Sequence, residues 1–148
     1  INKPSYNYLR EEFGEIYLFE GLSKYYSVIF FVKLNDKNYI IQGIRGTIDY
    51  DDKKMEDCYI QQETVINDIS PLFEISEKEK RSIPYTIDPS GNSKITYIKL
   101  RLKSGGVVSV ECSEWEEKFK IKNNFMNALV ISLESKEVNE WLTSERIN

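Results

Sequence analysis

Residues 94–112, KITYIKLRLKSGGVVSVEC, hold the most regular pattern in the chain. From Lys94 to Lys103, mainly apolar positions alternate with lysine, arginine and aromatic ones, which is the period of a strand with one buried and one solvated face. The SGG tripeptide at 104–106 has the composition of a tight turn, and Val107–Cys112 alternates again. This stretch therefore predicts an antiparallel hairpin with one basic face.

A second hairpin is predicted nearer the N-terminus. Ser27–Leu34 is rich in β-branched and aromatic residues, residues 35–38 (NDKN) have turn composition, and residues 38–48 are apolar again. Gly43 and Gly46 interrupt the second strand of this hairpin. A glycine inside a strand marks either a bulge or the close approach of another group, and we favour a bulge at both positions.

Between the hairpins the period of the apolar residues changes. From Met55 to Ile69 they recur at steps of three and four, which places them on one face of a helix. The acidic residues before this run can cap the helix, and Pro71 limits its end. The spacing predicts a helix over 54–69.

The rest of the chain adds two strands and a short helix. Glu15–Phe19 and Ala128–Leu133 are short apolar runs of strand length, and Ser135 can cap a short C-terminal helix. Residues 74–93 contain two prolines and show no sustained period, so we predict a long surface connection there. The fold class that follows is α+β: a mostly antiparallel, curved sheet of about six strands in two hairpins, with one central helix on a face and a short C-terminal helix.

The length of 148 residues fits one globular domain over 1–148, with residues 1–10 as a loosely ordered arm. The longest apolar run, Val28–Val32, is far too short to cross a membrane, so we predict no membrane contact. The richness in isoleucine, lysine and asparagine suggests the AT-rich genome of a bacterium. We predict a cytoplasmic protein, with periplasmic location or secretion after removal of a signal peptide as the alternative.

The two cysteines, Cys58 and Cys112, are too far apart in the chain for a CxxC redox or zinc pattern. They form either one long-range disulfide or two buried thiols. We favour the thiols, because a core of this size needs no covalent link.

The composition excludes several classes of chemistry. With no histidine, the chain lacks the usual general base and a common metal ligand, so serine triads, Cys–His pairs and zinc sites with histidine ligands are excluded. Residues 88–94 (DPSGNSK) resemble a phosphate-binding loop only superficially, because no predicted helix follows them. We predict a protein that is not an enzyme and holds no cofactor and no metal.

Two acidic clusters are the candidate binding sites. The first, at 49–57, lacks the spacing of a calcium loop and contains Lys53 and Lys54, so helix capping is favoured over cation binding. The second, at 111–117, surrounds Trp115, an aromatic residue of the type found at the centre of protein interfaces. The predicted partner-binding residues are Asp49, Tyr50, Asp51, Asp52, Glu56, Asp57, Glu111, Glu114, Trp115, Glu116 and Glu117.

The charge balance favours a protein partner. A net charge of -4 and a pI of about 5.1 argue against nucleic acid, despite the basic strand face, and suit a basic protein. We predict an inhibitor or immunity-type antidote that neutralises a basic partner such as a bacterial nuclease toxin. The alternative is a module that binds a small apolar ligand in a curved sheet or open barrel, lined by Phe30, Tyr39, Ile98 and Leu100.

Overall fold

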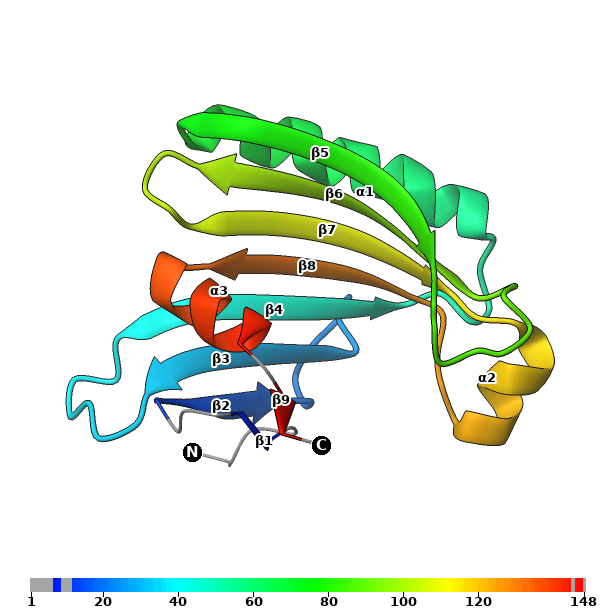
Figure 1. Ribbon diagram of the computed structural model, residues 1–148, viewed down its shortest axis with the longest axis horizontal. Coiled ribbons are helices and arrows are strands. Elements are labelled where there is room, and N and C mark those ends of the chain that lie inside the picture. Colours follow the sequence, from blue (N-terminus) through cyan, green and yellow to red (C-terminus); the bar gives the residue numbers. More distant parts are fainter. Residues whose placement is uncertain (1–6, 9–11, 145, 148) are drawn as a thin grey trace.

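The computed structural model describes residues 7–8, 12–144 and 146–147, with side chains described for 12–144. Its centre is one antiparallel sheet of seven strands in the order β2-β3-β4-β8-β7-β6-β5 (Figure 1). The strands are β2 (Phe13–Leu18), β3 (Ser27–Lys33), β4 (Ile41–Asp49), β5 (Ile75–Pro84), β6 (Lys94–Leu102), β7 (Val107–Glu114) and β8 (Ala128–Glu134). The helices are α1 (Met55–Ile69), a 3-10 turn (Ser70–Leu72), α2 (Glu117–Asn123) and α3 (Lys136–Thr143), and β1 (Asn7–Tyr8) pairs with β9 (Arg146–Ile147).

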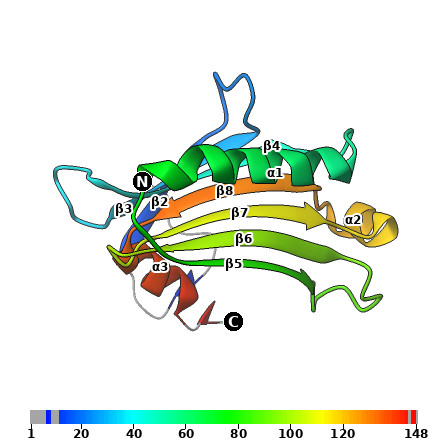
Figure 2. The same cartoon turned by 90° about the horizontal axis from the view of Figure 1, so that it is seen from above.

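The three helices occupy three different places around the sheet. Figure 2 shows α1 on one face and α3 on the opposite face, while α2 lies beyond one end of the strands. The predicted α+β fold, with its curved antiparallel sheet, its helix on one face and its short C-terminal helix, is therefore confirmed. Among the described elements no helix is both long and apolar enough to cross a membrane.

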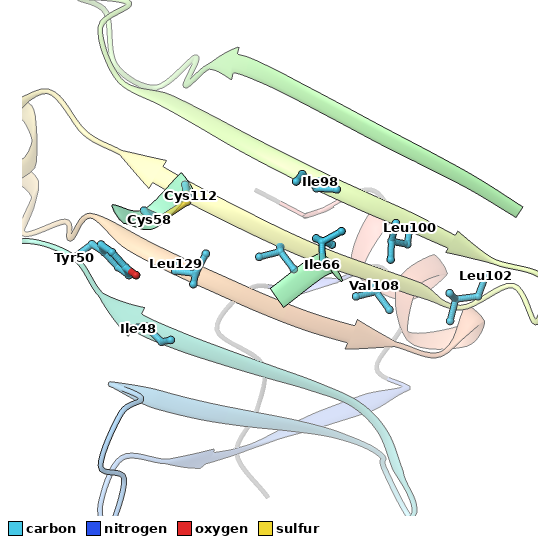
Figure 3. Packing of buried hydrophobic residues seen from close by; sticks show 11 residues of the cluster. Ile48, Tyr50, Cys58, Ile66, Ile98, Leu100, Leu102, Val108, Cys112 and Leu129 are labelled. Atoms are coloured by element: carbon cyan, nitrogen blue, oxygen red, sulfur yellow. A yellow bond between two sulfur atoms is a disulfide. The ribbon is translucent and has the colours of Figure 1, made fainter. Parts of the chain in front are cut away.

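The larger core lies between α1 and the sheet. Cys58, Gln62 and Ile66 recur every fourth residue, so they form one stripe on α1 and are fully buried. Figure 3 shows Cys58 and Ile66 directed at the strands. The buried residues of this cluster are Ile48, Tyr50, Cys58, Ile66, Ile98, Leu100, Leu102, Val108, Val110, Cys112 and Leu129. The Nε2 atom of Gln62 donates to the carbonyl oxygens of Thr96 and Val110, at 2.9 and 2.7 Å, which satisfies its NH2 group, whereas its Oε1 atom is buried without a hydrogen-bond partner among the described residues.

A disulfide joins α1 to β7 within this core. Cys58 and Cys112 are bonded, so the favoured prediction of two buried thiols is wrong and the alternative holds. The physical reason is the helix register, which directs Cys58 at the same strand face from which Cys112 projects. Sequence separation carries no information about this proximity.

The smaller core lies between α3 and the opposite face of the sheet. Phe13, Phe31, Val138 and Trp141 are fully buried there. The Trp141 ring centroid lies 5.3 Å from that of Phe13 and 6.3 Å from that of Phe31, and the Phe31 contact is edge-to-face. Ser135 caps α3 as predicted, because its hydroxyl accepts a hydrogen bond from the Val138 amide.

Two elements differ from the prediction. Residues 75–84 form the edge strand β5 rather than a surface connection, which raises the strand count from about six to seven. Most side chains of β5 are exposed and its alternation is one of charge, so it lacks the apolar period of a half-buried strand. The helix α2 was also not predicted, because its seven residues are too few to establish a helical period.

The glycines of β4 have two different causes. Gly43 lies where the β3–β4 register shifts beside Phe31, so the predicted bulge is confirmed there. At Gly46 the bulge prediction is wrong: a Cβ atom would lie 2.7 Å from the Tyr25 ring, so glycine is needed for this side chain to lie on the strand.

Candidate functional site

The two acidic clusters, which are far apart in sequence, meet at one end of the sheet. We call this region the α2 end, formed by residues 49–57, 85–93 and 114–127 (Figure 1). Asn127 connects the two clusters. Its carbonyl oxygen accepts from the Tyr50 amide, its side-chain oxygen accepts from the Trp115 amide, and its own amide donates to Asp51, each at 2.8 Å.

A nearly buried lysine strengthens the same connection. The Lys120 ammonium lies 3.1 Å from a carboxylate oxygen of Asp51 and 3.1 Å from one of Glu117. Burial alone would lower the pKa of Lys120, but hydrogen bonds to these two carboxylates outweigh it and the pKa is raised. Lys120 therefore stays charged and neutralises part of the acidic charge that the sequence places here.

The loop at 85–93 is held by the Asp88 carboxylate. It accepts hydrogen bonds from the amides and hydroxyls of both Ser90 and Ser93, with the Ser93 hydroxyl at 2.5 Å. These bonds, led by that of the Ser93 hydroxyl, hold the pKa of Asp88 at about 2, below its ordinary value of 3.8. The Ser93 hydroxyl also accepts from the Glu116 amide at 2.8 Å, which ties the loop to the start of α2.

Four aromatic side chains fill the space between this loop and α2, and we call them the aromatic cluster: Tyr85, Trp115, Phe119 and Phe125. Trp115 stacks on Tyr85 with ring centroids 4.0 Å apart and planes 12° apart, and it lies 4.6 Å from Phe125. Phe125 is 37% exposed, so the cluster reaches the surface there. The result is a rigid apolar anchor with a solvent-accessible edge.

Five further predicted residues fall into two groups. Asp52, Glu56 and Asp57 are exposed and form no ion pair within 12–144, so their charges face solvent. Asp49 and Glu116 have local roles, because their carboxylates accept from the Asp51 and Phe119 amides. Only the first group remains available to a partner.

Glu114 and Glu111 project from opposite faces of β7. Glu114 accepts from the Tyr59 hydroxyl at 2.8 Å and pairs with Lys94, beside α1. Burial and the Glu114 carboxylate raise the pKa of Tyr59. Glu111 lies on the face opposite α1, away from the other residues of the two acidic clusters.

Tyr50 does not serve as a surface anchor. It is 6% exposed and belongs to the core under α1, where burial followed by the nearby Asp57 charge raises the pKa of its hydroxyl. Tyr50 directly follows β4 and lies in the same buried cluster as Ile48, two residues earlier. We therefore remove Tyr50 from the proposed contact surface.

Neither cation binding nor the predicted apolar pocket has support from these contacts. In the part of the chain that the structure describes, no three Asp, Glu or Cys side chains are grouped so that they could hold a metal ion. Ile98 and Leu100 are fully buried in the core, whereas Tyr39 is 60% exposed on the β3–β4 loop. These residues do not line a common pocket.

Sequence reasoning missed most residues that organise this end. The turn string at 88–93 could have identified Asp88, because aspartate before such a turn often accepts hydrogen bonds from the following residues. Asn127 and Phe125 lie in a polar stretch without period, and nothing in the sequence relates them to Trp115.

No family model matches the chain, and neither a curated protein nor a solved structure matches it.

Proposed function

We propose that the chain is a non-catalytic protein-binding domain, an inhibitor or immunity-type antidote that neutralises a basic partner such as a bacterial nuclease toxin. The α2 end is its contact surface. The observation that carries the proposal is the aromatic cluster, whose exposed Phe125 edge lies on the same end of the fold as free carboxylates.

The proposal follows from how protein interfaces obtain affinity. A few buried aromatic anchors supply most of the binding energy, and they work best when they are already held in place before binding. Here the stack on Trp115 and the bonds from Asp88 and Asn127 fix the anchor in the free protein. Little ordering is therefore required on association.

We expect the charges at this end to attract a partner during association rather than to add to the aromatic contact. Asp52, Glu56 and Asp57 attract a basic surface, but the exposed lysines 53, 54, 118 and 122 are interspersed among the acids. The local excess of negative charge is consequently small. We expect the aromatic contact to govern the dissociation rate and the acids to govern the association rate.

The disulfide bears on where the protein works. Disulfides persist in the periplasm and outside the cell, and they are rare in the cytoplasm of mesophilic bacteria. The Cys58–Cys112 bond therefore supports the periplasmic or secreted alternative over the predicted cytoplasmic location. Thiol alkylation of the protein in its source cells tests this, because a cytoplasmic, reduced pool would be labelled before any reductant is added.

The decisive experiment is capture of the partner with matched variants. Wild-type protein, Phe125→Ala, and Leu72→Ala are used as bait in a lysate of the source organism, since Leu72 is 73% exposed but lies at the far end of α1. We expect a basic protein to be retained by the wild type and by Leu72→Ala, and lost with Phe125→Ala.

Inhibition is then measured directly. The captured protein is assayed for nuclease activity with and without one equivalent of the chain, and the proposal requires that activity to disappear. Retention by all three baits would move the contact surface away from the α2 end. A captured partner whose activity is unaffected would rule out the antidote role.

A further inference from the structure

A polar groove lies on the face of the sheet opposite α1, apart from the α2 end. Its volume is about 410 Å³, and it runs over β4, β8, β7 and β6, with residues of α3 on one side and Tyr85 at one end. Its polar lining includes Arg45, Lys99, Ser109, Glu111, Ser132 and Glu134. Tyr85 is the residue that it shares with the aromatic cluster.

One row of side chains crosses the floor of this groove. Arg45 is paired with Ser132, Ser132 with Ser109, and Ser109 with Lys99 in the strand register. Directly opposed residues of antiparallel strands project to the same face. The register therefore places two hydroxyl groups between two cations.

The two serines are buried although they lie on an open face. Ser109 is 4% exposed and Ser132 is 5% exposed. The Ser109 hydroxyl donates to Glu111 at 2.8 Å, whereas the Ser132 hydroxyl makes no hydrogen bond within residues 12–144. Among the described side chains the enclosed polar atom without a partner is Gln62 Oε1, so the Ser132 hydroxyl is reached by solvent and is open to a ligand group that enters the groove.

Only some of the charged side chains in the groove form ion pairs with one another. Arg45 pairs with Glu134 at 3.2 Å, and the Asn139 side chain also donates to Glu134 at 3.0 Å. Lys99 has no carboxylate partner among the described side chains and lies 5.2 Å from the Tyr97 ring centroid. Glu111 has no cationic partner in the same part of the chain. One cation and one carboxylate that have no ion-pair partner among the described residues thus lie on the neighbouring strands β6 and β7.

We propose that this groove binds a small zwitterion, such as a free α-amino acid. The ligand carboxylate binds the Lys99 ammonium and the Ser132 hydroxyl, and the ligand ammonium binds the Glu111 carboxylate. Lys99 and Glu111 lie on neighbouring strands, whose backbones are about 4.8 Å apart, so one small molecule that carries both charges can reach both side chains. This site does not depend on the proposed protein partner.

The test is a titration of the whole protein with small molecules, in which NMR spectra record the chemical shifts of the backbone amides at each addition. The probes are the neutral L-amino acids, with propionate and ethylamine as single-charge comparators for L-alanine. We expect saturable shifts confined to β6, β7 and β8 for at least one amino acid. Propionate and ethylamine should each bind roughly tenfold more weakly or worse than the amino acid, because each loses one charged hydrogen bond.

Matched variants assign the contacts. Lys99→Met and Glu111→Gln should each weaken binding by roughly tenfold or more. Lys103→Met and Glu117→Gln change the same residue types away from the groove and should leave affinity unchanged. Ser132→Ala, which alters no charge, should give a smaller loss, and dispersed spectra verify that each variant is folded.

Two results would overturn the proposal: the absence of saturable shifts at the groove with every amino acid, or equal affinity for alanine and propionate. Equal affinity would mean that Glu111 plays no part in binding. Neither result bears on capture of a protein by the α2 end, which Phe125→Ala tests separately.

Discussion

The two faces of the sheet are stabilised in different ways. The α1 face has eleven buried residues and a disulfide that fixes a fifteen-residue helix to β7. Among residues 12–144, the α3 face has a cluster of four fully buried residues, of which Val138 and Trp141 belong to the eight-residue helix α3 itself. An eight-residue helix is unstable alone, so α3 exists only through its packing and its cap. Within the described residues, the α1 face is therefore held by the larger buried cluster and a covalent bond, and the α3 face by a smaller buried cluster.

The largest effect should come from the α3 face. Trp141→Ala removes the ring that packs on Phe13 and Phe31, and it should lower the free energy of unfolding by up to roughly 5 kcal/mol. Urea denaturation measures this loss. A loss below about 1 kcal/mol would show that α3 is not held by this ring.

Removing the disulfide tests the α1 face. The double variant Cys58→Ala/Cys112→Ala releases a loop with a sequence separation of 54, which should cost about 4 kcal/mol through the greater entropy of the unfolded chain. Thermal unfolding of oxidised and variant proteins gives the comparison. If the melting temperatures agree, noncovalent packing alone holds α1.

The cap of α3 should have a moderate effect. Ser135→Ala removes the hydroxyl that accepts from the Val138 amide and should cost about 1 kcal/mol. Hydrogen exchange of the α3 amides is the more sensitive readout, because fraying at this end should increase exchange there before it affects α1. Uniform exchange changes in both helices would mean that the two faces unfold as one unit.

The smallest expected effect is a change in the pH dependence of stability, which is seen only at acidic pH. Because the pKa of Asp88 is about 2 when folded and 3.8 ordinarily, its stabilising contribution is complete above pH 3.8 and disappears as the pH falls through about 2. Asp88→Asn should therefore be less stable than the wild type at neutral pH, with a difference that shrinks across that window. A constant difference down to pH 2 would assign the effect to shape rather than charge.

Charge reversal at the α2 end complements these stability tests. Asp52→Lys/Asp57→Lys should slow association with the captured partner and weaken its salt dependence, while the control Asp68→Lys/Glu140→Lys makes the same change in net charge at exposed sites elsewhere. Stopped-flow association rates at two salt concentrations decide the matter. Equal effects of the two pairs would indicate that only the total charge matters.

Periodicity explains why much of the fold was predictable. The hairpin at 94–112 and the helix at 54–69 have strong periods because each has one buried face. The edge strand β5 has nearly all its side chains exposed, so no apolar period marks it. A period in the apolar residues indicates that one face of an element is buried, so an element with little buried surface cannot be predicted from it.

The candidate site was predictable only in its parts. The acidic clusters and Trp115 are visible in the sequence. The two clusters meet only because β8 lies between β4 and β7, so that Asp49 and Ser113 pair with Ala128 from its two sides. Strand order is a long-range property, and local patterns do not encode it. The burial of Tyr50 and the bond between Cys58 and Cys112 were missed for the same reason.

The position of β8 also determines when the two halves of the sheet can join during folding. The strands β2 to β4 and β5 to β7 form two separate ladders, and among the described strands only β8 joins them, through Gly43–Glu134 on one side and Val107–Glu134 on the other. Until β8 pairs with both ladders, β4 and β7 each expose an open edge on which another chain could pair. A folding chain in which β8 is not yet in place is therefore the form most exposed to aggregation, and chaperone binding should be concentrated on that form.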